Sequence, residues 1–275
     1  MNHLSATSAT SATKERIVVY FHGAPGAPAE SEIFHASAAK YGLNIVSHNR
    51  FAVDKNISAE SYFQLLASNI TMLAKDRQID VIGFSIGAFA ALQVCQLIPD
   101  KIKNLHLISP AAPLDCGDFI NHMAGKSVFR LAKNYPSLFK ILSYWQRLLA
   151  KYCPKLLVKM LFASAVAEDK VLIQSAHFQS WIGRVLQDCF SQNVTGYIRE
   201  IRAYVSPWNV SFKDTTIKAH LWHGNQDNWS PFTMSEYLSQ QFSGNLPIHR
   251  LIGLSHYSCL FKAVPEICEQ LGKDY

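Results

Sequence analysis

Three side chains of the types that cooperate in nucleophilic catalysis each follow a predicted strand of this sequence. Ser85 lies in the pattern G-x-S-x-G at residues 83–87, and Asp227 and His256 follow two strands near the end of the chain. A serine hydroxyl is a weak nucleophile until a base takes its proton and a third group orients that base. Ser85 is therefore a candidate nucleophile, and His256 and Asp227 are candidates for its base and for the orienting carboxylate.

The residues around Ser85 matter more than the five-residue pattern itself. An apolar run at 79–84 precedes Ser85, and a helical stretch of small and apolar residues follows at 88–94. A strand, a glycine-flanked turn and a helix in this order predict a nucleophile elbow. Because so sharp a turn occupies strained backbone space, its neighbours need to lack bulky side chains. The elbow would place the hydroxyl at the carboxyl end of a strand, beside a helix N-terminus.

Composition indicates a globular protein without a membrane span. The chain has 275 residues, of which 49% are hydrophobic and 17% charged, which suits a folded core rather than disorder. No run approaches the roughly 18 apolar residues of a spanning helix, and the first residues lack the features of a secretory signal. Three Ser-Ala-Thr triplets predict a disordered tail over 1–14. The six cysteines form no C-x-x-C pair, which indicates reduced thiols of a cytoplasmic protein rather than a disulfide framework or a zinc site.

Strands and helices alternate along most of the chain. We predict strands over 16–21, 43–47, 79–84, 104–109, 217–222 and 247–252. Helices are predicted over 30–40, 58–75 and 263–271, in addition to the helix after the elbow. Strands separated by helices predict an α/β fold with a doubly wound, mostly parallel sheet of about six to eight strands.

One segment is far longer than a connection between strands requires. Residues 115–206 have helical patterns and no convincing strand. We therefore expect a core of residues 15–114 and 207–275, with 115–206 inserted as a helical cap over the carboxyl edge of the sheet, where such folds bind ligands.

Four motifs, in this order and each after a predicted strand, resemble those of the α/β-hydrolase superfamily. They are H-G-x-P-G at 22–26, G-x-S-x-G at 83–87, G-x-x-D-x-x-x-P at 224–231 and G-x-x-H at 253–256. The resemblance covers roughly residues 16–113 and 216–270. The chain departs from most members in lacking an N-terminal hairpin, so the sheet would be a reduced one of six strands.

The resemblance implies a Ser-His-Asp triad. In it Ser85 is the nucleophile that attacks an acyl carbonyl, His256 is the general base and then acid, and Asp227 orients His256. It also implies an oxyanion hole formed by the backbone N–H groups of Ala24 and Ile86. Such paired donors stabilise the tetrahedral intermediate, and loss of one costs about 10²–10³ in rate.

The assigned acid and base each have a rival elsewhere in the sequence. Asp115, after the fourth strand, is the alternative acid, although the motif around Asp227 favours the latter. His22 is better explained as a structural histidine that holds its loop than as a chemical group. His249 lies within the sixth strand and is expected to be packed, whereas His256 is expected on a flexible loop.

The net positive charge is concentrated in part of the helical block. The net charge is +6, and the span 119–167 contains no Asp or Glu. Its cations recur at helical spacing among large apolar side chains; they are Lys126, Arg130, Lys133, Lys140, Arg147, Lys151, Lys155 and Lys159. The basic face could be merely solvated, could dock on an anionic membrane surface, or could guide an anionic substrate or acidic carrier protein. No binding motif or stacking platform for nucleic acid accompanies it.

The sequence thus predicts a cytoplasmic serine hydrolase that cleaves a carboxylic ester or thioester with an apolar acyl part. The apolar residues of the predicted cap motivate the preference for an apolar substrate. No metal or organic cofactor is implied. The alternatives are a catalytically silent member of the fold that binds a small ligand, and a lyase, acyltransferase or aminopeptidase that uses the same triad.

Overall fold

The computed structural model describes residues 16–53 and 57–274, so the predicted tail over 1–14 lies outside the described residues. Within them, one parallel sheet has the strand order β2-β1-β3-β4-β5-β6. The strands are β1 (Arg16–Phe21), β2 (Leu43–Val46), β3 (Ile79–Phe84), β4 (Ile102–Ile108), β5 (Lys218–Gly224) and β6 (Ile248–Leu251). All six predicted strands are confirmed, with ends that differ by one or two residues. The sheet is doubly wound and has the six strands expected without an N-terminal hairpin.

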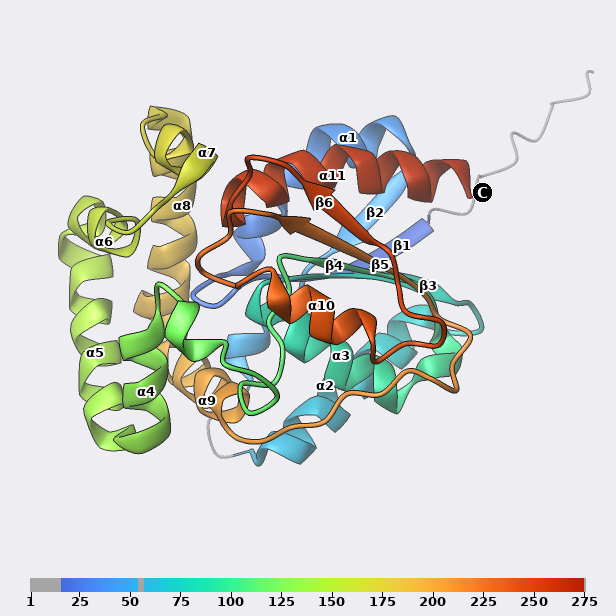
Figure 1. Cartoon of the computed structure of the whole chain (residues 1–275), viewed down its shortest axis with the longest axis horizontal. Coiled ribbons are helices and arrows are strands. Elements are labelled where there is room, and N and C mark those ends of the chain that lie inside the picture. Colours follow the sequence, from blue (N-terminus) through green and yellow to red (C-terminus); the bar gives the residue numbers. More distant parts are fainter. Residues whose placement is uncertain (1–15, 54–56, 275) are drawn as a thin grey trace, which may run out of the picture.

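Helices cover both faces of this sheet (Figure 1). On one side lie α1 (His35–Lys40) and α11 (His256–Lys273), and on the other α2 (Ala59–Ala74), α3 (Ile86–Leu97) and α10 (Thr233–Ser239). Since both faces are covered, central strands can be apolar throughout, and every residue of β3 is buried.

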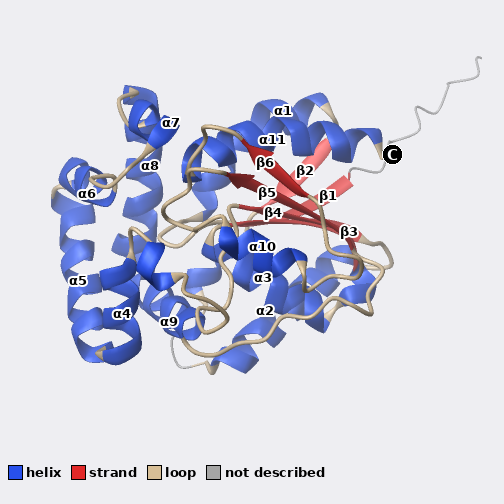
Figure 2. Cartoon of the chain, viewed as in Figure 1, coloured by secondary structure: helices blue, strands red, loops and turns tan. Residues whose placement is uncertain are grey.

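The long segment between β4 and β5 is helical, as predicted (Figure 2). It contains α4 (Lys126–Asn134), α5 (Pro136–Tyr152), α6 (Pro154–Leu161), α7 (Ala167–Leu172), α8 (Ala176–Gln187) and α9 (Asn193–Val205). These helices form a layer beyond the carboxyl ends of the strands, and α5 is on its outer side (Figure 1). No described helix is both long and apolar enough to cross a membrane.

The predicted start of the last helix, residue 263, is wrong. The helix α11 begins at His256, so His256 is not on a flexible loop but is the first residue of a helix. Two contacts hold this start. One is local, since Ser258 Oγ accepts the N–H of Ser255 at 2.8 Å, and the other comes from a distant part of the chain. The Asp169 carboxylate accepts hydrogen bonds from the N–H groups of Tyr257 and Ser258, which would otherwise lack partners in the first turn.

Candidate active site

Ser85 lies on a strained turn between β3 and α3. Its φ angle is 56°, a conformation that non-glycine residues rarely adopt. The turn is held by a 3.0 Å hydrogen bond from Ser85 N–H to Ile108 O. A side chain at Gly87 would lie 2.2 Å from the carbonyl oxygen of Phe21, so the elbow requires glycine there to pack against the loop after β1.

Asp227 lies in the turn after β5 and is bonded directly to His256. Its Oδ2 accepts a 2.8 Å hydrogen bond from His256 Nδ1. Its Oδ1 accepts the backbone N–H groups of Trp229 and Ser230, at 2.8 and 2.9 Å. Burial alone would raise the pKa of Asp227, but the charge of His256 and the hydrogen bonds from His223 and His256 outweigh it and lower this pKa well below its usual range. Asp227 is therefore a carboxylate at any neutral pH.

The Asp227 contact determines which nitrogen of His256 can act as a base. A carboxylate only accepts hydrogen bonds, so Nδ1 of the neutral ring carries the proton and Nε2 has a free lone pair. The ring is buried and stacks on Trp229 with centroids 5.3 Å apart and an interplanar angle of 18°. The ring also contacts that of Phe84, the residue before Ser85, with ring centroids 4.8 Å apart. These aromatic contacts hold the imidazole beside the elbow.

Ser85 and His256 are not hydrogen-bonded to each other in this structure. Among the described residues, Ser85 Oγ has no hydrogen-bond partner. Phe84, the residue before Ser85, contacts the His256 ring, and Trp229, which stacks on that ring, lines the same cavity as Ser85. In enzymes a nucleophile–base contact is often long or poorly aligned before the substrate complex forms, and tightens in that complex.

A small cavity joins Ser85 to the predicted oxyanion donors. It has a volume of about 90 Å³, and its wall includes Ala24, Ser85, Ile86 and Trp229. Ile86 is the first residue of α3, so its N–H has no acceptor inside the helix. The remaining wall is mostly apolar and comes largely from residues 115–206; it consists of Pro25, Ala111, Met123, Gly125, Val128, Phe129, Gln146, Leu161, Tyr197, Ile201 and Ser230.

A buried carboxylic acid supports the loop that carries Ala24. The Glu30 carboxylate lies in the 3₁₀ segment Pro28–Phe34 and accepts Gly23 N–H at 2.7 Å and Tyr20 Oη–H at 2.6 Å. Burial raises the pKa of Glu30 to about 7, although both hydrogen bonds and Arg50 act in the opposite direction. His22 is buried too, and its Nδ1 lies 2.9 Å from Gly23 O, as expected of a structural histidine.

The rival candidates lie elsewhere. Asp115 is exposed on the segment after β4, where its Oδ1 lies 4.0 Å from Sγ of neighbouring Cys116. His249 stacks on Trp222 with ring centroids 4.0 Å apart, so it is packed within the sheet as expected.

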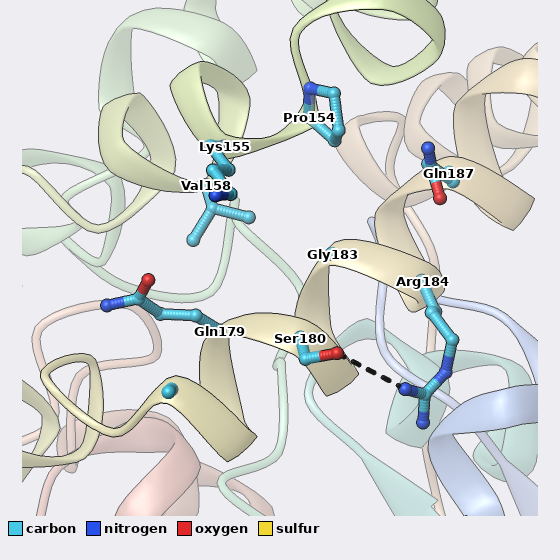
Figure 3. A pocket seen from close by; sticks show the side chains of 9 residues that line it. Pro154, Lys155, Val158, Gln179, Ser180, Gly183, Arg184 and Gln187 are labelled. Carbon is cyan, nitrogen blue, oxygen red and sulfur yellow. Dashed lines mark hydrogen bonds between the residues drawn. The ribbon is translucent and has the colours of Figure 1, made fainter.

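Two of the larger hollows of the described surface lie away from Ser85, Asp227 and His256. One, of about 370 Å³, lies between α6 and α8 and is lined by residues including Lys155, Gly183 and Arg184 (Figure 3). The other, of about 610 Å³, follows the outer face of α5. Neither contains Ser85, Asp227 or His256, so volume alone would point to the wrong place for chemistry.

Sequence reasoning missed several residues that contact or support the site. Trp229, Asp169, Glu200 and Arg50 are all partly or fully buried against it. Glu200 could have been noticed, because it is an acid within the apolar stripe of α9, close in sequence to Tyr197 and Ile201. The partners of these groups are too distant in sequence for a pattern to predict.

Comparisons with known proteins agree with this architecture. Over residues 8–257 the sequence matches the family described as lipid-droplet associated hydrolase. No curated protein matches it. Similar solved structures include an alpha/beta hydrolase fold protein from Nakamurella multipartita, with 14% identity and a TM-score of 0.62 over 94% of this chain and 91% of the other.

Two further structures show how widely the fold is used. A thermophilic esterase from Thermogutta terrifontis has 14% identity and a TM-score of 0.63 over 94% of this chain and 90% of the other. A bromoperoxidase from Bacillus anthracis has 14% identity and a TM-score of 0.65 over 94% and 92%. At such identities the likeness shows the α/β-hydrolase fold, and the reaction must be argued from the site.

Proposed function

Since the chain belongs to the lipid-droplet associated hydrolase family, we propose that it is a serine hydrolase that cleaves carboxylic esters or thioesters of apolar acyl groups. The observation that carries this proposal is the buried 2.8 Å hydrogen bond between Asp227 and His256 beside the Ser85 elbow. Such a carboxylate fixes the tautomer of the imidazole and stabilises the imidazolium that forms when the serine is deprotonated.

The reaction proceeds through an acyl-enzyme. Ser85 Oγ attacks the acyl carbon while its proton passes to His256 Nε2, and the carbonyl oxygen becomes an oxyanion that accepts from the N–H groups of Ala24 and Ile86. The bond to the leaving alcohol or thiol then breaks, and the leaving group takes the proton from His256. Water then attacks the acyl carbon while His256 takes its proton. The bond between this carbon and Ser85 Oγ breaks, Oγ takes the proton back from His256, and the acid is released.

The apolar wall of the cavity supports an apolar acyl group. Its volume of about 90 Å³ is below the roughly 300–1,000 Å³ of typical ligand pockets. Cap side chains such as Val128, Phe129 and Leu161 must therefore shift to admit an extended chain. We accordingly propose that residues 115–206 act as a cap over the site.

A fluorophosphonate probe tests the nucleophile. We expect the wild type to be labelled and to hydrolyse p-nitrophenyl esters with apolar acyl chains, and Ser85→Ala to do neither. Ser206→Ala, which removes an exposed hydroxyl bonded to Arg202 O, is the matched control and should behave as the wild type. An unlabelled, folded wild type would favour the silent, ligand-binding alternative, and equal labelling of Ser85→Ala would exclude Ser85 as the nucleophile.

The outer face of α5 and α6 supports a second proposal, that the cap docks on an anionic lipid surface. Large apolar side chains are exposed at helical spacing along this face; they are Leu138, Ile141, Trp145, Leu148, Tyr152, Leu156 and Met160. Exposed apolar stripes of this length are rare on soluble proteins unless the stripe binds a partner or a membrane. The family description, lipid-droplet associated hydrolase, agrees with a lipid surface as the partner of this face.

The charges beside that stripe match an anionic surface. Lys140, Arg147 and Lys151 line the same hollow as Ile141 and Trp145. Basic amphipathic helices bury their apolar face at the headgroup boundary while their cations meet anionic lipid. An acidic carrier protein would use the cations but would not explain the apolar stripe, so lipid is the better-supported partner.

Sedimentation with vesicles tests the surface. We expect the protein to bind phosphatidylserine-containing vesicles more than pure phosphatidylcholine vesicles, and less at high salt. Leu148→Ser should weaken binding, whereas Met72→Ser, at an exposed methionine of α2, should not. If binding is the same for both kinds of vesicle, and the same for Leu148→Ser as for the wild type, this face is not the docking surface.

A further inference from the structure

Two fully buried carboxylates of the cap contact the parts of the core that carry the proposed catalytic groups. Asp169 comes from α7 and Glu200 from α9, and both are 0% exposed. Buried acids are costly unless they are paired or hydrogen-bonded, so each contact is informative about what the cap does.

Asp169 holds the start of the helix that carries His256. Its Oδ1 accepts Ser258 N–H at 2.8 Å, and its Oδ2 accepts Tyr257 N–H at 3.1 Å. Figure 1 shows α7 beside the corresponding end of α11. A carboxylate at a helix N-terminus satisfies free N–H groups and interacts favourably with the helix dipole. Because His256 is the first residue of α11, this contact fixes the backbone from which the imidazole extends.

Glu200 reaches the other side of the site through Arg50, which lies in the 3₁₀ turn Arg50–Ala52. Its carboxylate accepts Arg50 Nη2 at 2.6 Å and Nε at 2.8 Å in a bidentate pair, and Tyr62 Oη–H at 2.8 Å. Burial by itself would lower the pKa of Arg50, but Glu200 outweighs it and raises this pKa. The guanidinium is therefore a fixed, buried cation.

The same guanidinium bonds the peptide that carries a proposed oxyanion donor. Arg50 Nη2 donates to Gly23 O over 3.2 Å, and Gly23 C=O shares its planar peptide unit with the N–H of Ala24. A cation bonded to this carbonyl fixes the peptide plane and polarises the amide, which strengthens the N–H as a donor. Glu30 fixes the preceding peptide from the opposite direction, through Gly23 N–H.

We propose that Asp169 and Glu200 are positioning residues that make the cap part of the catalytic machinery. Asp169 holds the helix that carries the base, and Glu200, through Arg50, orients and polarises the peptide of the Ala24 donor. This inference rests on the proposed serine hydrolase activity. It predicts that α7 and α9 stay attached to the core when substrate enters, so that α4, α5 and α6 provide the movement.

Steady-state kinetics of conservative variants test the proposal. In Asp169→Asn, Glu200→Gln and Arg50→Lys we expect kcat for a short p-nitrophenyl ester to fall about tenfold or more, a fraction of the 10²–10³ lost with a whole oxyanion donor. KM should change by less than about threefold, because these residues do not touch the acyl cavity. The matched control is Glu32→Gln. It breaks another ion pair between cap and core, Arg184–Glu32 at 2.7 Å, which is exposed, and should leave kcat unchanged.

Active-site titration and amide hydrogen exchange separate positioning from simple loss of fold. The fall in kcat should persist per titrated site, with faster exchange at Tyr257 and Ser258 in Asp169→Asn and at Gly23, whose N–H is bonded to Glu30, in Glu200→Gln. An unchanged kcat per titrated site would overturn the proposal. If these variants do not fold, Asp169→Glu and Tyr62→Phe perturb the same contacts more gently, and unchanged kcat in both would also overturn it. A wild type that hydrolyses no ester would contradict the proposed function itself, while exchange still reports on the two contacts.

Discussion

At the scale of the residue, the environment of Asp227 separates an orienting carboxylate from an ordinary turn aspartate. A turn aspartate is exposed and exchanges its partners with water. Asp227 is buried, accepts two backbone N–H groups with one oxygen and binds His256 with the other. The residue type and its place after β5 were predictable from the sequence, whereas its burial and its pairing required the fold.

The first prediction concerns this pair. Asp227→Asn should lower kcat for ester hydrolysis by about 10⁴, because an amide can donate to Nδ1 and so favours the wrong imidazole tautomer. The same change at the rival acid, Asp115→Asn, should leave kcat within about twofold, since Asp115 is exposed and does not contact His256. Turnover of a p-nitrophenyl ester, normalised to folded protein, measures both. A large loss in Asp115→Asn, with Asp227→Asn near wild type, would reverse the assignment of the acid.

At the scale of the element, apolar patterns predicted the sheet well and predicted helix ends less well. Each strand is a local run whose burial on both faces requires apolar residues, so its position can be recognised from the chain alone. The start of α11 depends on Asp169, which lies in the cap and is remote in sequence from the helix that it caps. A local pattern also marks this start, because Ser258 Oγ accepts the N–H of Ser255 at 2.8 Å in a capping pair. Residues 253–271 contain no information about the additional contact from Asp169.

The second prediction concerns two glycines in the interiors of cap helices. A Cβ at Gly196 of α9 would lie 2.0 Å from Phe51 O, whereas a Cβ at Gly183 of α8 would meet nothing within 4 Å. We expect Gly196→Ala to lower the free energy of unfolding by about 1–3 kcal/mol through overpacking. Gly183→Ala should raise it by about 0.5–1 kcal/mol, because alanine is the better helix former.

Urea unfolding of both variants measures this difference. Gly196→Ala should also lower kcat, since α9 must then move away from the segment that carries Arg50. If Gly196→Ala were as stable and as active as Gly183→Ala, the close approach of α9 to the core would not be needed for either property.

At the scale of the whole molecule, buried histidines and a buried glutamic acid have opposite effects on the free energy of unfolding as pH falls. Burial lowers the pKa of His22, and burial together with neighbouring histidines lowers those of His106 and His220. Unfolding frees these rings to bind protons, so they destabilise the fold below about pH 6.5. Glu30 acts in the opposite sense, because burial raises its pKa from 4.5 to about 7.

The third prediction isolates Glu30 from the histidines. A carboxyl group whose pKa is raised by folding contributes stability that is complete below pH 4.5 and lost as pH rises toward 7. The shift corresponds to about 3 kcal/mol at 1.36 kcal/mol per pH unit. In Glu30→Gln this titration is absent, while the amide oxygen can still accept from Gly23 N–H and Tyr20 Oη–H. The free energy of unfolding of the variant, relative to wild type, should therefore increase by about 3 kcal/mol between pH 4.5 and pH 7.

Urea unfolding of both proteins at a series of pH values gives this difference directly, because the histidine contributions are common to both and cancel. The increase should lie within the interval between the two pKa values and level off outside it. A difference that does not vary with pH would mean that Glu30 is ionised in the fold as easily as in the unfolded chain. The hydrogen bonds from Tyr20 and Gly23 to Glu30 would then hold the Ala24 loop, and ionisation of Glu30 would not lower the free energy of unfolding.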